Sequence, residues 1–458
     1  MIPIEQACFW IAGLPRRELT RLSAPTKADV VIIGGGFTGF WTALFLKELD
    51  PTLDVALIEQ GVAAYGASGR NAGMLSETVD HSHALAIQHF GAAEAAKLAL
   101  LGKQNADELI AFIRDRGIAC DYEPSGRLKV ALTERHVEDA KRILEVAEAL
   151  GLSSFRLLNR EQTQDEVHCP LFLGAVEVSG GGILNPAKLT DGLRREAERL
   201  GVRVFERTTV ESIDEQGAAV VVRANGTTLK APRAVLATSA YTHHLVPGVR
   251  HRFIPLYDYI VVSEPLTAEQ WALIGWKKHQ GITDGRNFFN YYRPTADGRV
   301  LWGTSAAAYY AGNRVDPSCD HSLPHYAALK ASWIRHFPEL AGLQWPFAWG
   351  GAICSTTRLT PFFGSALRGK ACYGLGYTGH GIATTRIAGR ILAHMALDRT
   401  TDLLDLSLVK KPPFPYPPEP IRAWAVSAVT ASLLKVDAGE SPNLLLRMLD
   451  AMGLGFSS

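Results

Sequence analysis

The fold of this chain is decided by the stretch ADVVIIGGGFTG, residues 28–39. Its apolar first half predicts a buried parallel strand, and the residues after it, 40–47, predict a helix. Between the two, Gly34 permits a tight turn, Gly36 lets a pyrophosphate approach the main chain, and Gly39 lets the helix pack on the strand. The amino end of the helix then faces the anion. The stretch therefore predicts a dinucleotide-binding turn.

A carboxylate follows at the spacing that such a turn requires. The apolar run Val55–Ile58 ends at Glu59, about 20 residues after Gly39, where it can accept hydrogen bonds from both hydroxyls of an adenosine ribose. The chain then enters a loop of small residues, Ala64–Met74, whereas an NAD-binding unit normally continues into another strand and helix. Small residues suit close backbone approach to a flat ring. The pattern therefore favours FAD over NAD.

Length and composition bound the class of protein. At 458 residues, with 47% hydrophobic and 20% charged residues, the chain reads as a soluble globular protein of at least two domains. A formal net charge of +1 gives no global attraction to nucleic acid or acidic lipid, so small-molecule partners are expected. The amino terminus lacks a secretory pattern and no apolar run is long enough to span a membrane. The six cysteines lie scattered without metal spacing, which favours the cytoplasm.

A second glycine-rich turn, Gly376–Gly381, lies more than 300 residues after the first and opens a predicted helix over 382–397. The region 252–305 is instead rich in aromatic and β-branched residues, and Asp297-Gly298 predicts a hairpin within it. We interpret this region as an antiparallel sheet over the substrate. One cofactor held by both ends of the chain is the simplest reading of the two turns.

The predicted fold class is α/β: a Rossmann-like FAD-binding domain of the GR2 type, with an interleaved α+β substrate domain built on an antiparallel sheet. The predicted boundaries place a lead-in segment at 1–25, the discontinuous FAD-binding domain at 26–83, 170–249 and 350–400, the substrate domain at 84–169 and 250–349, and a Pro-rich linker with a helical tail at 401–458. The region 84–116 predicts helix broken near Gly91 and Gly102. The apolar tail helices suggest packing or a contact between copies of the chain.

From about residue 28 to residue 400 the sequence resembles FAD-dependent amine and amino-acid oxidoreductases of the glycine oxidase, sarcosine oxidase and D-amino acid oxidase group. The most distinctive matches are the loop Gly66–Gly73 and the turn Gly376–Gly381. Phe9-Trp10, the hairpin around Asp297-Gly298 and Trp349-Gly350-Gly351 look most like the gamma-glutamylputrescine oxidoreductase branch.

The resemblance implies positions for the cofactor contacts. For the nucleotide half of FAD, it places Phe37 and Thr38 on the pyrophosphate, Glu59 and Gln60 by the adenosine ribose, and Val210 at the adenine. In the small-residue loop, it places Ala67 and Ser68 near the phosphates, with Arg70 and Asn71 beside them, and Ala72, Gly73 and Met74 along the flavin. The pyrimidine end of the ring and the ribityl chain would be held by Gly376, Tyr377, Thr378, Gly379, His380, Gly381 and Ile382. A helix that begins there presents its positive end to the reduced, negatively charged flavin.

One departure from the family bears on the substrate. Amino-acid oxidases of this group fix the substrate carboxylate with an Arg before a Pro-aromatic-Ile-Gly strand and usually a second one in the late glycine turn. Here those positions fall on Ile353 and Gly379. Without an arginine at either position, no guanidinium can bind an α-carboxylate through two hydrogen bonds there, so an amine is favoured over a simple amino acid.

The candidates for the catalytic site are His380, Arg293, Tyr292 and Tyr259. His380 lies in the turn that faces the flavin and could tune the ring or steer substrate, or only fill space. Arg293, beside Tyr292, is the candidate for binding an anionic group, against the alternative of a solvated hairpin charge. Tyr259 could point at the flavin across the sheet, as could Tyr257, and core packing is the alternative for both.

Other conspicuous residues give weaker predictions. Arg70 could reach a phosphate or the flavin N5 region, or brace its loop, and Arg358 is a second possible anion anchor. The histidine pairs at 81/83 and 243/244 lack further ligands, so no metal site is predicted. Cys354 is expected to be a buried free thiol, which leaves FAD non-covalently bound.

These observations predict an enzyme that moves a hydride from the carbon beside a neutral amine nitrogen to flavin N5, giving an imine that water hydrolyses. Dioxygen or another acceptor then reoxidises the flavin. The alternative within the enzyme class is a dehydrogenase of an N-substituted amino acid or aminophosphonate, with Arg293 or Arg252 on the anion. A flavin-binding subunit without turnover of its own is the alternative from another class.

Overall fold

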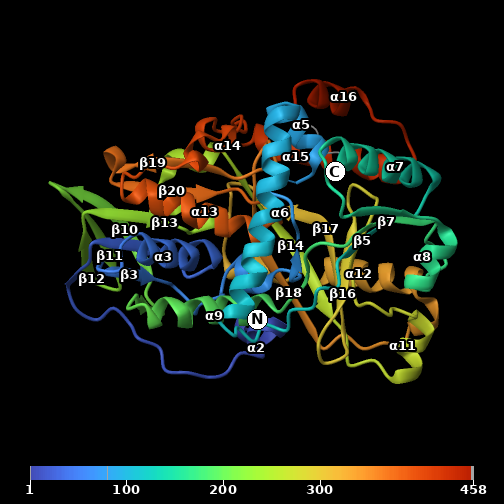
Figure 1. Ribbon diagram of the computed structural model, residues 1–458, viewed down its shortest axis with the longest axis horizontal. Coiled ribbons are helices and arrows are strands. Elements are labelled where there is room, and N and C mark those ends of the chain that lie inside the picture. Colours follow the sequence, from blue (N-terminus) through green and yellow to red (C-terminus); the bar gives the residue numbers. More distant parts are fainter. Residues whose placement is uncertain (1, 80, 455–458) are drawn as a thin grey trace.

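The computed structural model describes residues 2–79 and 81–454, so residues 1, 80 and 455–458 of the predicted segments lie outside the described residues. Figure 1 shows two lobes with the long helix α6 (Ala92–Asp115) between them. One lobe is built on a six-stranded sheet and the other on an eight-stranded sheet. The two-lobed α/β architecture confirms the predicted fold class.

The six-stranded sheet is the predicted nucleotide-binding sheet. Its order is β19 (Phe362–Ala366), β20 (Ala371–Leu375), β13 (Arg233–Leu236), β2 (Val30–Ile33), β3 (Val55–Ile58) and β9 (Arg203–Phe205), and all neighbours are parallel except β19 and β20. Because side chains alternate along a strand, Val30 and Ile32 face one layer while Val31 and Ile33 face another. Both layers are apolar, which explains why these strands read as uninterrupted hydrophobic runs.

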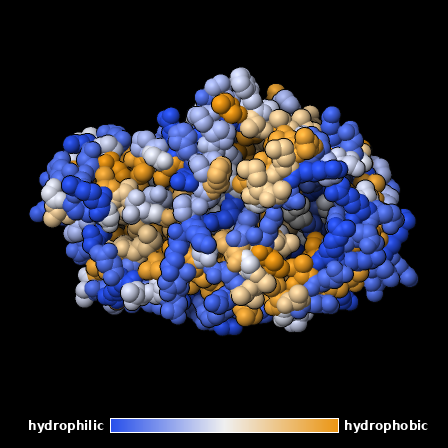
Figure 2. Space-filling model, turned by 90° about the horizontal axis from the view of Figure 1, so that it is seen from above, coloured by the Kyte–Doolittle hydropathy of each residue, from blue (hydrophilic) through white to orange (hydrophobic). Residues whose placement is uncertain are grey.

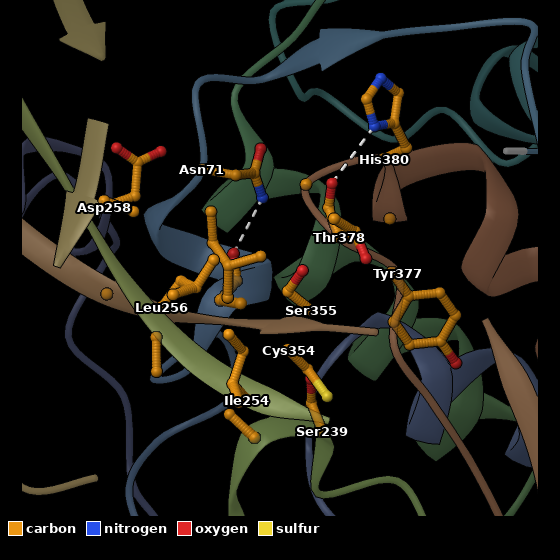
Figure 3. A pocket seen from close by; sticks show the side chains of 18 of the residues that line it. Asn71, Ser239, Ile254, Leu256, Asp258, Cys354, Ser355, Tyr377, Thr378 and His380 are labelled. Atoms are coloured by element: carbon orange, nitrogen blue, oxygen red, sulfur yellow. Dashed lines mark hydrogen bonds between the residues drawn. The ribbon is translucent and has the colours of Figure 1, made fainter. Parts of the chain in front are cut away.

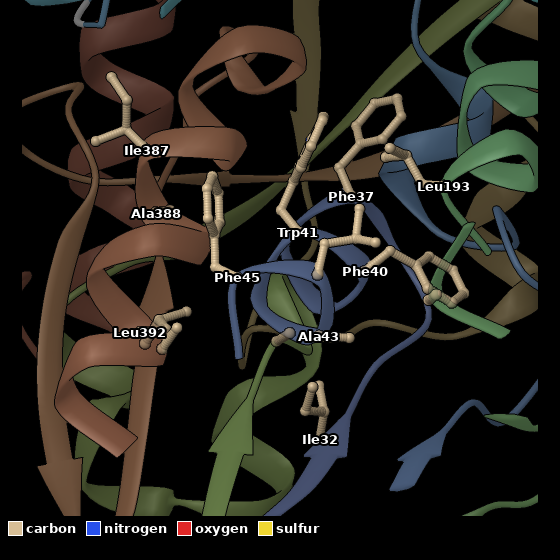
Figure 4. Close-up of a cluster of buried hydrophobic side chains, with 14 of the residues drawn as sticks. Ile32, Phe37, Phe40, Trp41, Ala43, Phe45, Leu193, Ile387, Ala388 and Leu392 are labelled. Atoms are coloured by element: carbon tan, nitrogen blue, oxygen red, sulfur yellow. The ribbon is translucent and has the colours of Figure 1, made fainter. Parts of the chain in front are cut away.

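Helices cover one face of this sheet and a smaller sheet covers the other. The helical layer contains α3 (Phe37–Leu49), α6, α9 (Pro186–Arg199) and α13 (Gly381–Ala396). Phe40, Trp41 and Phe45 of α3 fill the space between α9 and α13 (Figure 4). The opposite layer is a four-stranded sheet in the order β1 (Thr26–Lys27), β12 (Thr227–Ala231), β11 (Ala219–Ala224) and β10 (Val210–Gln216).

The eight-stranded sheet forms the wall of the second lobe. Its order is β18 (Phe347–Ser355), β14 (Ile254–Val262), β17 (Val300–Tyr309), β16 (Asn290–Pro294), β15 (Gly281–Asp284), β5 (Arg127–Ala131), β7 (Gly174–Val178) and β6 (Phe155–Leu158). All neighbours are antiparallel except β15 and β5. The predicted hairpin at Asp297-Gly298 joins β16 to β17.

The remaining elements are short or peripheral. They are α1 (Ile4–Ala7), α2 (Phe9–Ala12), α4 (Ala67–Arg70), β4 (Met74–Leu75), α5 (His83–Phe90), α7 (Glu134–Ala149), α8 (Arg160–Glu166), β8 (Gly182–Ile183), α10 (Thr242–Leu245), α11 (Ala268–Ile274), α12 (Leu323–His336), α14 (Ser407–Lys410), α15 (Ile421–Asp437) and α16 (Leu444–Ala451), with 3-10 turns at Ser239–Tyr241, Pro247–His251, Pro317–Asp320, Pro338–Leu340, Leu367–Gly369 and Asp402–Asp405.

Three predicted boundaries need correction. Strands β7 and the carboxyl half of β18, assigned by sequence to the FAD-binding domain (170–249 and 350–400), pair within the eight-stranded sheet. Helix α6, assigned to the substrate domain (84–169), packs on the core of α3 and α13. An isolated strand or helix does not reveal which sheet it joins, because that depends on partners far away in the chain.

The predicted helix break near Gly102 is also wrong, whereas the one at Gly91 is confirmed. Gly91 has a φ of +79° and separates α5 from α6. Gly102 lies inside α6, where an added Cβ would lie 2.1 Å from the carbonyl oxygen of Glu77. The glycine therefore serves close packing and not a break.

Candidate active site

The first glycine turn is built on close backbone contacts. Gly34 has a φ of +113°, and a Cβ added there would lie 2.5 Å from the carbonyl oxygen of Ala237. A Cβ on Gly39 would lie 1.9 Å from the carbonyl oxygen of Gly34, so only glycine lets α3 approach β2 this closely. Gly36 precedes α3 and has no side chain to cap it, and the first amide of the helix, that of Phe37, donates to the Ser68 hydroxyl. Gly36, Phe37 and Thr38 all line the cavity described below.

Glu59 and Gln60 lie at the end of β3, next to this turn. The Glu59 carboxylate accepts hydrogen bonds from the amides of Gly35 at 2.7 Å and Gly61 at 2.8 Å. Burial raises the pKa of Glu59, and the two amide hydrogen bonds oppose that rise. The side chain is therefore held in one orientation at the wall of the cavity.

The second glycine turn meets the first, as the sequence predicted. The hydroxyl of Thr38, on α3, donates a hydrogen bond to the Tyr377 hydroxyl at 2.9 Å, across 339 positions of sequence. Gly389 of α13 fits directly against the backbone of Trp41, where an added Cβ would lie 2.7 Å from the carbonyl carbon. The two turns therefore face one space.

That space is a cavity of about 740 Å³ lined by both turns, the small-residue loop, β14, β18 and the carboxyl-terminal tail. Figure 3 shows the part of its wall that is formed by Asn71 of the loop, by β14 and β18, and by Tyr377, Thr378 and His380 of the second turn. Its wall contains twenty of the predicted cofactor residues: Gly34, Gly36, Phe37, Thr38, Glu59, Gln60, Ala67, Ser68, Arg70, Asn71, Ala72, Gly73, Met74, Val210, Tyr377, Thr378, Gly379, His380, Gly381 and Ile382. Gly39 and Gly376 lie behind this wall and shape the two turns. The volume is within the range of cofactor and ligand sites.

The small-residue loop is fixed by its own hydrogen bonds. The Ser68 hydroxyl accepts from the amide of Phe37 at 2.9 Å, and the Asn71 side chain donates to the carbonyls of Ala67 and Ser68 while it accepts from the amide of Gly73. A Cβ on Gly73 would lie 2.0 Å from the Leu184 carbonyl oxygen. The loop thus offers a narrow, backbone-lined surface, which suits a flat ring.

The lead-in segment supports this loop from behind. Trp10 is 2% exposed and donates its indole N–H to the carbonyl of Asn71 at 3.0 Å. Trp10 and Ile11 also pack with Ala187, Ile260 and Trp349, so this segment is anchored on the main body.

Arg70 braces the loop and also lines the cavity. Its guanidinium pairs with Asp320 at 2.8 Å and donates to the carbonyls of Tyr65 and Gly350. Its Nη2 is buried and has no partner among the described residues. One donor of Arg70 is therefore available to a bound group.

The positions of Arg293, Tyr259 and Tyr292 correct the sequence interpretation, because none of them lines the cavity. Tyr259 donates to the Cys319 carbonyl, and Tyr292 stacks on Trp302 at 4.1 Å; both belong to the core on the far face of the sheet, as does Tyr257. Arg293 is buried and donates to the carbonyls of Gly73, Leu184 and Pro294.

Arg293 therefore positions the Gly73 loop, and Arg293→Met is expected to destabilise it. The change removes the arginine donors from the carbonyls of Leu184 and Pro294, while the Gly73 carbonyl keeps the Leu184 amide. The free energy of unfolding should therefore fall by about 3 kcal/mol, and the bound flavin fraction should fall with it. Urea unfolding and absorbance of the purified protein measure both. Arg135→Met, on exposed α7, is the control. Unchanged stability with a raised KM for an anionic substrate would restore the direct role predicted from sequence.

His380 lies on the cavity wall with its ring 4.8 Å from that of His81. Burial lowers the pKa of His380 to about 4, with the positive charge of Arg127 adding to the effect. The imidazole is therefore neutral at physiological pH, so it can donate or accept a hydrogen bond there but carries no charge.

Three charged residues on the cavity wall were missed by the sequence interpretation: Asp258, Arg127 and Arg422. Asp258 lies on β14 between the two buried tyrosines, and Arg127 lies at the start of β5. The Nε of Arg127 has no hydrogen-bond partner among the described residues. Because side chains alternate along β14, Asp258 lies on the opposite face from Tyr257 and Tyr259, but this alternation alone does not show which face lines the cavity.

The tail was also missed as a part of this wall. Val426, Val429 and Leu433 of α15 and Leu445 and Leu449 of α16 line the cavity. Seen from the side of α16, the surface carries hydrophobic patches between hydrophilic residues (Figure 2).

The two other arginines considered as anion anchors bind backbone instead. Arg358 donates to the backbone carbonyls of Pro361, Leu408 and Lys411, and Arg252 donates to the backbone carbonyl of Pro413.

The remaining sequence predictions concern metal and thiol chemistry. Within residues 2–79 and 81–454, no group of three or more His, Cys, Asp and Glu side chains is arranged to hold a metal ion. Cys354 lines the cavity, and burial raises the pKa of its thiol far above the ordinary value.

Within residues 2–79 and 81–454, no helix is long and apolar enough to cross a bilayer.

Comparison with known proteins identifies the class. The family model of FAD-dependent oxidoreductases, DAO, matches residues 29–395. The chain is 29% identical to a probable oxidoreductase, OrdL, of Rhizobium meliloti, over 90% of this chain and 94% of the relative. It is 30% identical to gamma-glutamylputrescine oxidoreductase of Escherichia coli, over 86% and 89%. Glycine oxidase from Geobacillus kaustophilus shares the fold, with a TM-score of 0.66 and 23% identity over 83% of this chain and 98% of that one.

The cavity fits the cofactor of this family. Close-packed glycines border it at both turns, and the loop between them presents backbone and not bulky side chains to it. The enzyme is accordingly FAD-dependent, as the sequence predicted. Its glycine turns, its cavity and the match over most of its length together show that the chain belongs to the DAO family of FAD-dependent oxidoreductases.

Proposed function

We propose that this enzyme oxidises a C–N bond of a substituted amine, so that the resulting imine is hydrolysed to a carbonyl compound and a smaller amine or ammonia. Gamma-glutamylputrescine, the substrate in the name of the Escherichia coli relative, is the first compound to test. Dioxygen or another acceptor would take the electrons onward.

The residues of both turns would hold FAD. The amides of Gly36 and Thr38 would receive the pyrophosphate, Glu59 the ribose hydroxyls, and the segment Tyr377–Ile382 the ring. When bound, FAD would supply the two-electron acceptor that side chains lack. The protein would orient the amine, keep water out with its apolar wall, and place the positive end of α13 near the ring.

The preference for an amine depends on one observation. Ile353 and Gly379 both line the cavity, and neither can bind a carboxylate in the place where amino-acid oxidases of this family use arginine. Because a planar guanidinium fork is the usual partner of a carboxylate, its absence from these positions favours a substrate without an α-carboxylate at the reacting carbon.

A second candidate is a dehydrogenase of an N-substituted amino acid or aminophosphonate. The observation that favours it is Arg127, whose Nε is buried at the cavity without a partner among the described residues. Burial lowers the pKa of Arg127 because it destabilises the charged guanidinium, and an anionic group on the substrate would stabilise that charge. Arg127 replaces Arg293 and Arg252 as the residue to test for this activity.

The deciding experiment is anaerobic mixing of the purified yellow enzyme with single compounds, followed by the flavin absorbance. Gamma-glutamylputrescine, putrescine and butylamine are expected to bleach it, and glycine and D-alanine are not. Bleaching by free D-amino acids alone would overturn the proposal, and bleaching by N-methyl amino acids or aminophosphonates alone would establish the second candidate. A protein that no compound bleaches would support the flavin-binding subunit without turnover.

We also propose a reducing compartment such as the cytoplasm and an assembly of copies through the tail. All six cysteines are buried and unpaired in the described chain, which supports the first. Trp424 and Leu444 are 69% and 73% exposed, which supports the second. Sedimentation of the purified protein tests the assembly.

A further inference from the structure

Asp258 is the acidic side chain that β14 directs toward the cavity. Ile254, Leu256, Asp258 and Ile260 alternate along this strand and all line the cavity, whereas Tyr257 and Tyr259 face the core behind the sheet. Figure 3 draws Asp258 on one side of the cavity and Thr378 and His380 on the other. Asp258 therefore faces the same space as the predicted flavin-binding segments.

Among the described residues, the carboxylate of Asp258 has two hydrogen-bond donors and no cationic partner. The Tyr291 hydroxyl donates to its Oδ2 at 2.6 Å, and the amide of Tyr259 donates to its Oδ1 at 2.8 Å. Arg70 lies across Gly351, the residue paired with Asp258 on β18, but its charge is matched by Asp320. No Lys, Arg or His of the described chain forms an ion pair with Asp258.

The surroundings make an unpaired carboxylate costly. Leu256, Ile260, Phe289 and Trp349 line the same cavity, and burial raises the pKa of Asp258 to about 7, against the lowering effect of the Tyr291 hydrogen bond. A carboxylate has about four acceptor positions, of which two are used here. A positively charged ligand would fill the others and remove the cost.

We propose that Asp258 binds the ammonium group of the amine substrate and takes one proton from it, so that the amine becomes neutral inside the cavity. This inference rests on the proposed function and adds the group that recognises the substrate. In the step, R–CH₂–NH₃⁺ and the Asp258 carboxylate give R–CH₂–NH₂ and the Asp258 carboxylic acid. One N–H bond breaks, one O–H bond forms, and nothing is oxidised or reduced.

The arrangement suits proton transfer better than permanent charge pairing. An aliphatic ammonium in water is a much weaker acid than a carboxyl group, but desolvation lowers the pKa of the former and raises that of the latter. In an apolar cavity the two values therefore approach each other. Tyr291 is the titratable side chain in contact with Asp258, and it holds the carboxylate in place while the proton moves.

The test compares Asp258→Asn with wild-type holoenzyme in anaerobic reduction by the best amine of the panel. Asn keeps the shape and can still accept from Tyr259, so FAD content should be unchanged while the rate constant of reduction falls about 100-fold or more. The wild-type rate should fall as pH decreases through about 7, because the protonated acid cannot accept a proton, and this limb should disappear in the variant. Asp214→Asn, on exposed β10, is the matched control.

Two further measurements separate this role from a structural one. Tyr291→Phe removes a hydrogen bond that favours the ionised acid, so the limb should move to higher pH. Tert-butylamine has no hydrogen on the carbon beside nitrogen and cannot be oxidised, so it reports binding alone. Calorimetric titration at pH 8 should show roughly tenfold weaker binding to Asp258→Asn, because a hydrogen bond between charges is lost.

The outcomes distinguish this inference from the proposed function. If amines reduce wild type and Asp258→Asn at equal rates with the same pH profile, the role of Asp258 is wrong and amine oxidation stands. If no amine reduces wild type while tert-butylamine still binds through Asp258, the cation site stands and the proposed reaction is wrong. If tert-butylamine binds both proteins equally, the cation site is wrong.

Discussion

Gly39→Ala is expected to yield a protein without flavin. The added methyl group would lie 1.9 Å from the Gly34 carbonyl oxygen, so α3 must move away from β2. The amides of Gly36 and Thr38 would move with it, and the pyrophosphate would lose its donors. The dissociation constant for FAD should rise about 100-fold or more, which corresponds to about 2.7 kcal/mol. Absorbance and quenching of FAD fluorescence measure the change.

Gly342→Ala is the control for this variant. Gly342 is exposed, does not line the cavity, has no positive φ and has no described atom within 4 Å of an added Cβ, so Ala should be tolerated and the protein should stay yellow. Far-ultraviolet circular dichroism checks that both variants fold. A folded Gly39→Ala protein that keeps wild-type affinity for FAD would show that the first turn does not bind the cofactor.

Val429→Glu is expected to weaken substrate binding strongly while it leaves FAD in place. Val429 belongs to a face of α15, with Val426 and Leu433, that follows helical spacing and lines the cavity. A carboxylate there brings water or an unpaired charge into an apolar wall, a cost on the order of 2 kcal/mol. KM for the best amine should therefore rise about 30-fold. FAD content should not change, because the predicted cofactor contacts lie within residues 34–382.

Leu434→Glu tests whether any charge on α15 has this effect. Leu434 is 52% exposed on the same helix and does not line the cavity, so the KM of this variant should match that of wild type. Steady-state kinetics and the flavin spectrum of both variants decide the matter. Equal KM values for Val429→Glu and wild type would mean that the tail is not part of the substrate site. The match to the family model ends at residue 395, before α15 and α16.

Local patterns predicted the nucleotide-binding half of the molecule well. The turn after β2, the acid after β3 and the helix after Gly381 each depend on residues within about 30 positions of one another, and backbone sterics allow few alternatives there. Thr38 and Tyr377 meet as the two-turn interpretation required.

The substrate half was predicted less well, because its side chains take their roles from the faces of strands. Period-two alternation placed Tyr257 and Tyr259 opposite Asp258 but did not show which set meets the cavity. Packing against α12 and its neighbours draws the tyrosines into the core, and Asp258 is left facing the cavity. The sequence likewise did not show which face of β16 carries Arg293, and in the structure its side chain donates to the carbonyl of Gly73.

By itself, the sequence determined the α/β class, the dinucleotide turn, the acid that follows it and the preference for FAD, because glycine stereochemistry and strand-helix periodicity act over short distances. Only the tertiary structure decided that Asp258, Arg127 and the tail helices meet at one cavity. These groups come from β14, β5 and α15–α16, and their proximity is set by the order of strands in a sheet and by long-range packing, which no local pattern encodes.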